Sequence, residues 1–73
     1  MITGAQVRVA RRLLGWTAHE LAHRAVVSIE IVELIEATPG PVRGSLGRLA
    51  AIQATLEAGG IEFTDTGRVR LLP

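Results

Sequence analysis

Residues 17–36, TAHELAHRAVVSIEIVELIE, decide the fold of this 73-residue chain. Thr17 and Glu20 have the spacing of a helical capping box. The apolar stripe of this helix comprises Leu21, Ala22 and Ala25. Ser28 then caps another helix that runs to about Glu36, and only about two residues separate the two helices, so they meet at a sharp turn. Two short helices joined in this way after a longer one are typical of a helix-turn-helix.

The flanking sequence predicts two more helices. A first helix is expected over residues 4–14, with a capping box of Thr3 and Gln6 at its start and Gly15 as a left-handed cap at its end. Residues 38–41, TPGP, predict a loop. A fourth helix is expected over residues 45–58, and its apolar face comprises Leu46, Leu49, Ile52 and Leu56.

The last part of the chain alternates apolar and polar residues around a turn at 65–67. We expect a short hairpin there, which pairs Ile61 and Phe63 with Val69 and Leu71. Because a lone hairpin is marginally stable in water, it should pack on the helices or pair with a second subunit. The predicted fold is therefore all-α, a four-helix repressor-like helix-turn-helix domain with a short C-terminal β-hairpin. Residues 1–58 form the helix-turn-helix domain, and 59–73 form a tail available for dimerisation.

Composition narrows the functional classes. The chain has no cysteine, which excludes disulfides, thiolate metal sites and thiol nucleophiles. Its hydrophobic content of 48% argues against disorder, and its net charge is only +1. The sequence has no apolar run of the ~18 residues that a transmembrane helix needs, so a cytoplasmic protein without membrane contact is expected.

Residues 6–37 resemble the Xre/Cro family, which includes the lambdoid phage repressors. The matching residues are Val7, Arg11, Leu14-Gly15-Trp16-Thr17, Glu20-Leu21-Ala22, Val27-Ser28, Val32 and Ile35-Glu36-Ala37. The resemblance implies a DNA-binding transcriptional regulator, without enzymatic activity or cofactor, that reads double-stranded DNA with its third helix. It also implies a partly buried ion pair between Arg11 and Glu36. The small core and the apolar tail favour a homodimer, which an operator with two half-sites requires.

Two positions depart from the family pattern. Ala18 stands where the family usually has a glutamine that contacts DNA, and Val26 stands where the turn usually has glycine. A β-branched residue is costly at positive φ, so an adjusted turn is expected.

The third helix also has unusual residues for a DNA-reading element. Its inward positions are Val32 and Ile35, which leaves Ile29, Glu30 and Leu34 at the positions that read bases, with Glu33 alongside. Glutamates oppose phosphate binding, although Glu can accept a hydrogen bond from cytosine N4 and Ile or Leu can contact a thymine methyl. Phosphates would then be bound by Ser28, helix N-termini, Arg43 and Arg48. The residues predicted to bind DNA or a partner are Thr17, Ala18, Ser28, Ile29, Glu30, Glu33, Leu34 and Arg43.

Two alternatives remain open from the sequence. In the first, a degenerate helix-turn-helix binds another protein, such as a transcription factor or a polymerase subunit, through an apolar patch of Ile29, Ile31 and Leu34. In the second, the third helix is rotated or more deeply buried and carries no site.

Residues 19–23 match the zinc motif H-E-x-x-H, which places His19 and His23 on one helix face. Glu20 is already explained as a capping residue, and the two residues after it as core. A peptidase also needs a third ligand and a substrate cleft. No metal or catalytic residue is therefore predicted, and His19 and His23 are candidates only for adventitious zinc binding.

Overall fold

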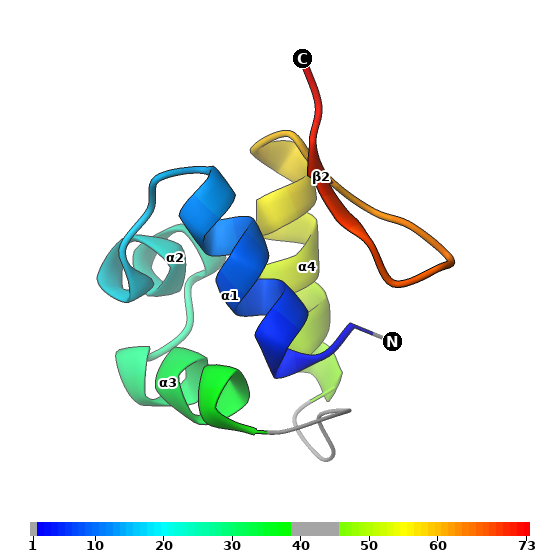
Figure 1. Ribbon diagram of the computed structural model, residues 1–73. Helices are drawn as coiled ribbons and strands as arrows, with labels where there is room; N and C mark the ends of the chain where they lie inside the picture. The colour runs from blue at the N-terminus through cyan, green and yellow to red at the C-terminus, as the bar shows by residue number, and fades with distance from the viewer. Residues whose placement is uncertain (1, 39–45) are drawn as a thin grey trace.

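The structure, a computed structural model, describes residues 2–38 and 46–73. Arg43, most of the predicted loop at 38–41 and the side chain of Leu46 lie outside the described residues. This part of the chain forms four helices followed by a two-stranded antiparallel sheet (Figure 1). The elements are α1 (Gly4–Leu13), α2 (Ala18–Ala25), α3 (Ile29–Ala37), α4 (Leu46–Ala58), β1 (Ile61–Phe63) and β2 (Val69–Leu71). No helix of these residues is long and apolar enough to cross a membrane.

Side chains at the helix N-termini explain where α1 and α2 begin. The capping box of α1 is confirmed, because Thr3 Oγ1 accepts from the Gln6 amide at 3.2 Å and Gln6 Oε1 accepts from the Thr3 amide at 2.7 Å. Only half of the box predicted for α2 is present. Thr17 Oγ1 accepts from the Glu20 amide at 3.0 Å, but no described hydrogen bond joins the Glu20 carboxylate to Thr17. That carboxylate lies instead 3.7 Å from Arg24 Nε, one helical turn further along.

All four helices and the first strand contribute to one apolar core. Its buried members are Ile2, Val7, Ala10, Leu21, Ala22, Ala25, Val32, Ile35, Leu49, Ile52, Leu56 and Ile61. The helical spacing of these residues explains why each helix buries one face and leaves the other in solvent. Each Val, Leu or Ile that is buried completely contributes about 1.5–3 kcal/mol to folding.

The predicted hairpin is confirmed, and its residues pair as Ile61↔Leu71, Glu62↔Arg70 and Phe63↔Val69. It packs on the helices, with β1 against α4 and β2 against α1. Gln6 Nε2 on α1 donates to the carbonyl oxygen of Gly67 at 2.9 Å, which fixes the hairpin turn to the start of α1. Because Ile61 belongs to the shared core, the hairpin is part of the same folded unit as the helices.

Gly4 allows α1 to approach the end of α3 closely. A Cβ atom at this position would overlap the carbonyl oxygen and carbon of Ile35, and it would lie 3.0 Å from the Thr38 carbonyl oxygen. Only glycine fits there, so this residue determines how near the start of α1 lies to the C-terminal turn of α3.

Candidate nucleic-acid interface

Three residues, Val26, Val27 and Ser28, connect α2 to α3. Val26 has φ 57° and ψ 46°, the left-handed conformation that the turn was expected to avoid. Its amide donates to the His23 carbonyl at 3.3 Å, and the Val27 amide donates to the Ala22 carbonyl at 3.0 Å. These two bonds close a Schellman motif in which valine occupies the glycine position. The expectation of an adjusted turn is therefore wrong: the turn is retained, with backbone strain of about 1–3 kcal/mol.

The orientation of α3 is determined at its start and along its inner face. Ser28 Oγ accepts from the Ile31 amide at 3.3 Å and caps the helix. Val32 and Ile35 are buried in the core, as predicted. Together the cap and the two buried side chains anchor α3 to the domain, and the remaining face of α3 is directed outward.

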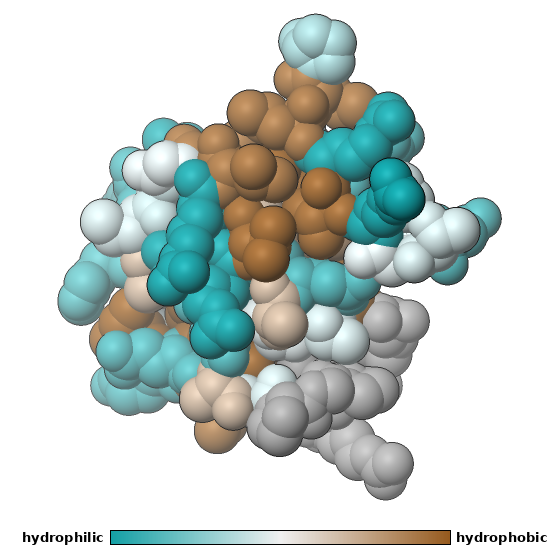
Figure 2. All heavy atoms as spheres, in the orientation of Figure 1, coloured by the Kyte–Doolittle hydropathy of each residue, from teal (hydrophilic) through white to brown (hydrophobic). Residues whose placement is uncertain are grey.

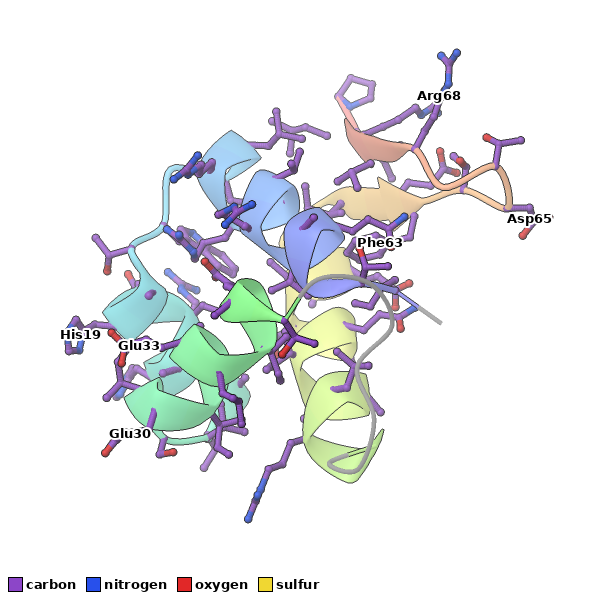
Figure 3. The ribbon with its side chains drawn as sticks, turned by 60° about the horizontal axis from the view of Figure 1, so that its bottom comes forward. His19, Glu30, Glu33, Phe63, Asp65 and Arg68 are labelled. Atoms are coloured by element: carbon purple, nitrogen blue, oxygen red, sulfur yellow. The ribbon has the colours of Figure 1, made fainter. Side chains whose placement is uncertain are left out.

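The outward face of α3 carries Glu30, Glu33 and Leu34, all exposed, with 62% of Leu34 accessible. Figure 3 shows Glu30 and Glu33 projecting from the side of the molecule that also bears His19, remote from Phe63, Asp65 and Arg68 of the hairpin. The outward face of α3 is therefore accessible at Glu30, Glu33 and Leu34, where the alternative of a more deeply buried helix does not hold.

Ile29 and Ile31 differ from their predicted placement. Both are half-buried and pack against the core. The predicted exposed patch of Ile29, Ile31 and Leu34 is therefore reduced to Leu34, and Ile29 offers only part of its side chain to a ligand. The reason is that Ile29 and Ile31 flank the buried stripe of Val32 and Ile35, and both side chains contact apolar residues of the core.

Arg11 and Glu36 form the expected ion pair, which joins α1 to the end of α3. Arg11 Nε lies 2.7 Å from Glu36 Oε2, Nη2 lies 2.9 Å from Oε1, and the side chains are 14% and 11% exposed. Arg11 Nη1 also donates to the Trp16 carbonyl at 2.9 Å. The hydrogen bond to Glu36 is the main cause that raises the pKa of Arg11, opposed by desolvation. One guanidinium thus connects α1, α3 and the turn before α2.

At the start of α2, Thr17 is exposed, whereas Ala18 is half-buried and packs against the core. Ala18 therefore contributes packing and offers no hydrogen-bonding group. Further along α2, the Arg24 guanidinium lies over the Trp16 ring, 4.5 Å from its centroid, a cation–π contact that sequence reasoning missed. The two side chains line an open depression of about 610 Å³ with Glu20, His23, Thr55, Ala58 and Gly59.

The described ion pairs join Glu36 to Arg11, Glu20 to Arg24 and Glu62 to Arg70. Glu30 and Glu33 take part in none of these pairs. The described surface of α3 is therefore acidic around an exposed Leu34. Of the predicted phosphate-binding groups, Ser28, the N-cap of α3, and Arg48 on α4 are exposed.

His19 and His23 are both exposed on α2. In residues 2–38 and 46–73, no group of three or more His, Cys, Asp or Glu side chains is placed to hold a metal ion.

Comparison with known proteins finds no matching family model, no matching curated protein and no matching solved structure.

Proposed function

We propose that this chain is a small DNA-binding transcriptional regulator of the Xre/Cro type, which acts in the cytoplasm as a homodimer and has no enzymatic activity. The observation that carries the proposal is the pair α2 and α3, joined by a three-residue turn, with α3 anchored from one side and exposed on the other. A helix held in this way fits the major groove, which admits one α-helix.

Groups that bind phosphate are available at the N-termini of α2 and α3 and on α4. The exposed hydroxyls of Thr17 and Ser28 mark the N-termini of α2 and α3, where amides and the helix dipole favour an anion. Arg48 is exposed near the start of α4. Such contacts set the position of a protein on the duplex, whereas contacts to base edges select the sequence.

The base-reading surface in this proposal consists of Glu30, Glu33 and Leu34. A glutamate accepts a hydrogen bond from cytosine N4, and a leucine contacts the thymine methyl group. Because both glutamates repel phosphates, we expect weak binding to generic DNA and a large dependence of affinity on the operator sequence.

A mobility-shift titration on DNA from the promoter of the chain's own gene tests the proposal. If a dimer neutralises about six phosphates, affinity should fall about a thousandfold between about 50 and 200 mM salt. The variant Glu33→Arg should bind generic DNA more tightly than the wild type. Glu57→Arg on α4, an exposed position with the same charge change, is the matched control. An equal effect of both variants, or of neither, would contradict the placement of α3 on DNA.

A second candidate function is favoured by Glu30 and Glu33 beside Leu34, since neither glutamate takes part in an ion pair among the described residues. In this alternative, α3 binds a protein that has a basic rim and an apolar pocket, such as a transcription factor or a polymerase subunit. Leu34→Ala would then abolish binding, and Glu33→Arg would weaken it because the new charge repels the basic rim. No shift of promoter DNA at low salt would favour this alternative over DNA binding.

A further inference from the structure

The open depression between α2 and the end of α4 has the size of a small-molecule site. Its volume of about 610 Å³ lies within the range of about 300–1,000 Å³ that is usual for ligand pockets. Its walls come from α2 and from the last turn of α4, which pack against each other. The apolar area that Figure 2 shows over α1 and β2 is a separate surface, since the depression is not lined by its exposed residues Val9, Leu13, Leu71 and Leu72.

The floor of the depression is apolar and depends on a glycine. A Cβ atom added to Gly59 would lie 2.9 Å from Cη2 and 3.2 Å from Cζ2 of Trp16. Because Gly59 has no side chain, the indole of Trp16 lies directly against the end of α4. Ala58, the preceding residue, is exposed and contributes only a methyl group. The edge of an indole, a methyl group and a glycine therefore leave room for the apolar side chain of a ligand.

The rim of the depression carries one positive and one negative side chain. The Arg24 guanidinium is held over the Trp16 ring, and a guanidinium held by its face can still donate from its in-plane N–H groups. Glu20 Oε2 lies 3.7 Å from Arg24 Nε, whereas a charge-assisted hydrogen bond of this kind measures about 2.7–2.9 Å. Both groups therefore keep hydrogen-bonding capacity for a ligand placed between them.

We propose that this depression binds an α-amino acid with a large apolar side chain. The carboxylate of the ligand accepts hydrogen bonds from Arg24, its ammonium group donates to Glu20, and its side chain covers Ala58 and the edge of Trp16. An α-amino acid carries both charges on one carbon atom, so it fits between two opposite charges that lie 3.7 Å apart. Neither the ligand nor the pair of side chains has a net charge, so the complex leaves no charge without a partner.

Ligands with a single charge fit this rim less well. A carboxylate without an ammonium group adds a second negative charge beside Glu20, and an amine without a carboxylate adds a second positive charge beside Arg24. The two rim side chains are 43% and 49% exposed, so each ion pair contributes modestly and burial of the ligand side chain supplies most of the affinity. We therefore expect a dissociation constant of about 1 mM or lower. The described lining residues lie outside α3, so this binding goes beyond the proposed function and does not require DNA.

Fluorescence titration of the full chain with L-phenylalanine tests the proposal. Trp16 is the only tryptophan, so its emission reports directly on the depression. Phenylalanine should change this emission saturably, with a dissociation constant of about 1 mM or lower. Two analogues, 3-phenylpropionate and phenethylamine, each retain the phenyl ring and one charge, and each should bind more weakly by about threefold or more. A linear change without saturation counts as collisional quenching and not as binding.

Two variants with matched controls assign the site. Arg24→Met should raise the dissociation constant for phenylalanine about fivefold or more, whereas Arg12→Met, an exposed arginine outside the depression, should leave it unchanged. Ala58→Leu fills the depression and should abolish binding, whereas Ala50→Leu at another exposed position of α4 should have no effect. Circular dichroism checks that each variant is folded.

Three results would each overturn the proposal. The first is the absence of saturable binding of phenylalanine up to about 10 mM. The second is an analogue with a single charge that binds as tightly as phenylalanine. The third is a folded Arg24→Met or Ala58→Leu variant that retains the affinity of the wild type. A mobility-shift titration of DNA is not affected by any of these outcomes, so failure of this proposal is distinguishable from failure of the proposed function.

Discussion

Val26→Gly should stabilise the protein, because the wild type places a β-branched residue in the left-handed region. At φ 57° and ψ 46°, the strain at valine is about 1–3 kcal/mol, and glycine removes it. Because the Val26 side chain is 89% exposed, the substitution loses almost no packing. Glycine also broadens the unfolded ensemble, which costs about 0.5–1 kcal/mol. The balance is a gain of about 1 kcal/mol, or about 4–8 °C in Tm for a domain of this size.

Thermal unfolding followed by circular dichroism measures this gain, with all variants compared at one protein concentration, because any self-association makes Tm depend on concentration. Val26→Asn should lie between the wild type and Val26→Gly, because asparagine tolerates the left-handed region better than valine. Gly15→Ala is the reciprocal control, because Gly15 has φ 72° and no atom lies within 4 Å of an added Cβ. Alanine therefore introduces backbone strain without a clash, and it should lower the free energy of unfolding by about 1 kcal/mol. If Val26→Gly left Tm unchanged or lowered it, the strain argument would be refuted.

Two further substitutions test contacts that position α3. Gly4→Ala should destabilise the fold by about 3 kcal/mol or more, since the new Cβ meets the Ile35 carbonyl. Gly47→Ala on α4 is the control, because its new Cβ meets no atom within 4 Å and the substitution should be neutral or stabilising. Urea unfolding measures both changes in stability. Arg11→Met should cost about 2–3 kcal/mol because it leaves Glu36 without its partner, and adding Glu36→Leu should recover part of that loss in a double-mutant cycle. Since the pKa of Arg11 is raised, its contribution to stability is complete below the unfolded pKa and is lost only in strong alkali, so the cost of Arg11→Met should show no dependence on the ionisation of Arg11 near neutral pH.

Sequence reasoning was most reliable where structure depends on near neighbours in the chain. The caps at Thr3, Thr17 and Ser28 and the left-handed end at Gly15 follow from side chains within three or four residues of the backbone groups they satisfy. The inward positions of α3 follow from the helical repeat, which requires only that one side of the helix has a core to face.

Tertiary structure decided which groups are exposed and which charges are paired. Periodicity distinguishes Val32 from Glu33, but it does not show that Ile29 and Ile31 also find apolar neighbours, because those neighbours come from distant parts of the chain. The sequence offered the Glu20 carboxylate two partners, the Thr17 amide and the Arg24 guanidinium. In the structure the carboxylate lies beside Arg24, and Arg24 in turn stacks on Trp16. Only the Thr17 hydroxyl forms its capping hydrogen bond. The hairpin lies beside α1 through contacts such as the hydrogen bond from Gln6 to the Gly67 carbonyl, which joins residues 61 positions apart in the sequence. Local chemistry therefore determined the elements, and contacts between distant segments determined which faces of those elements are available to a partner.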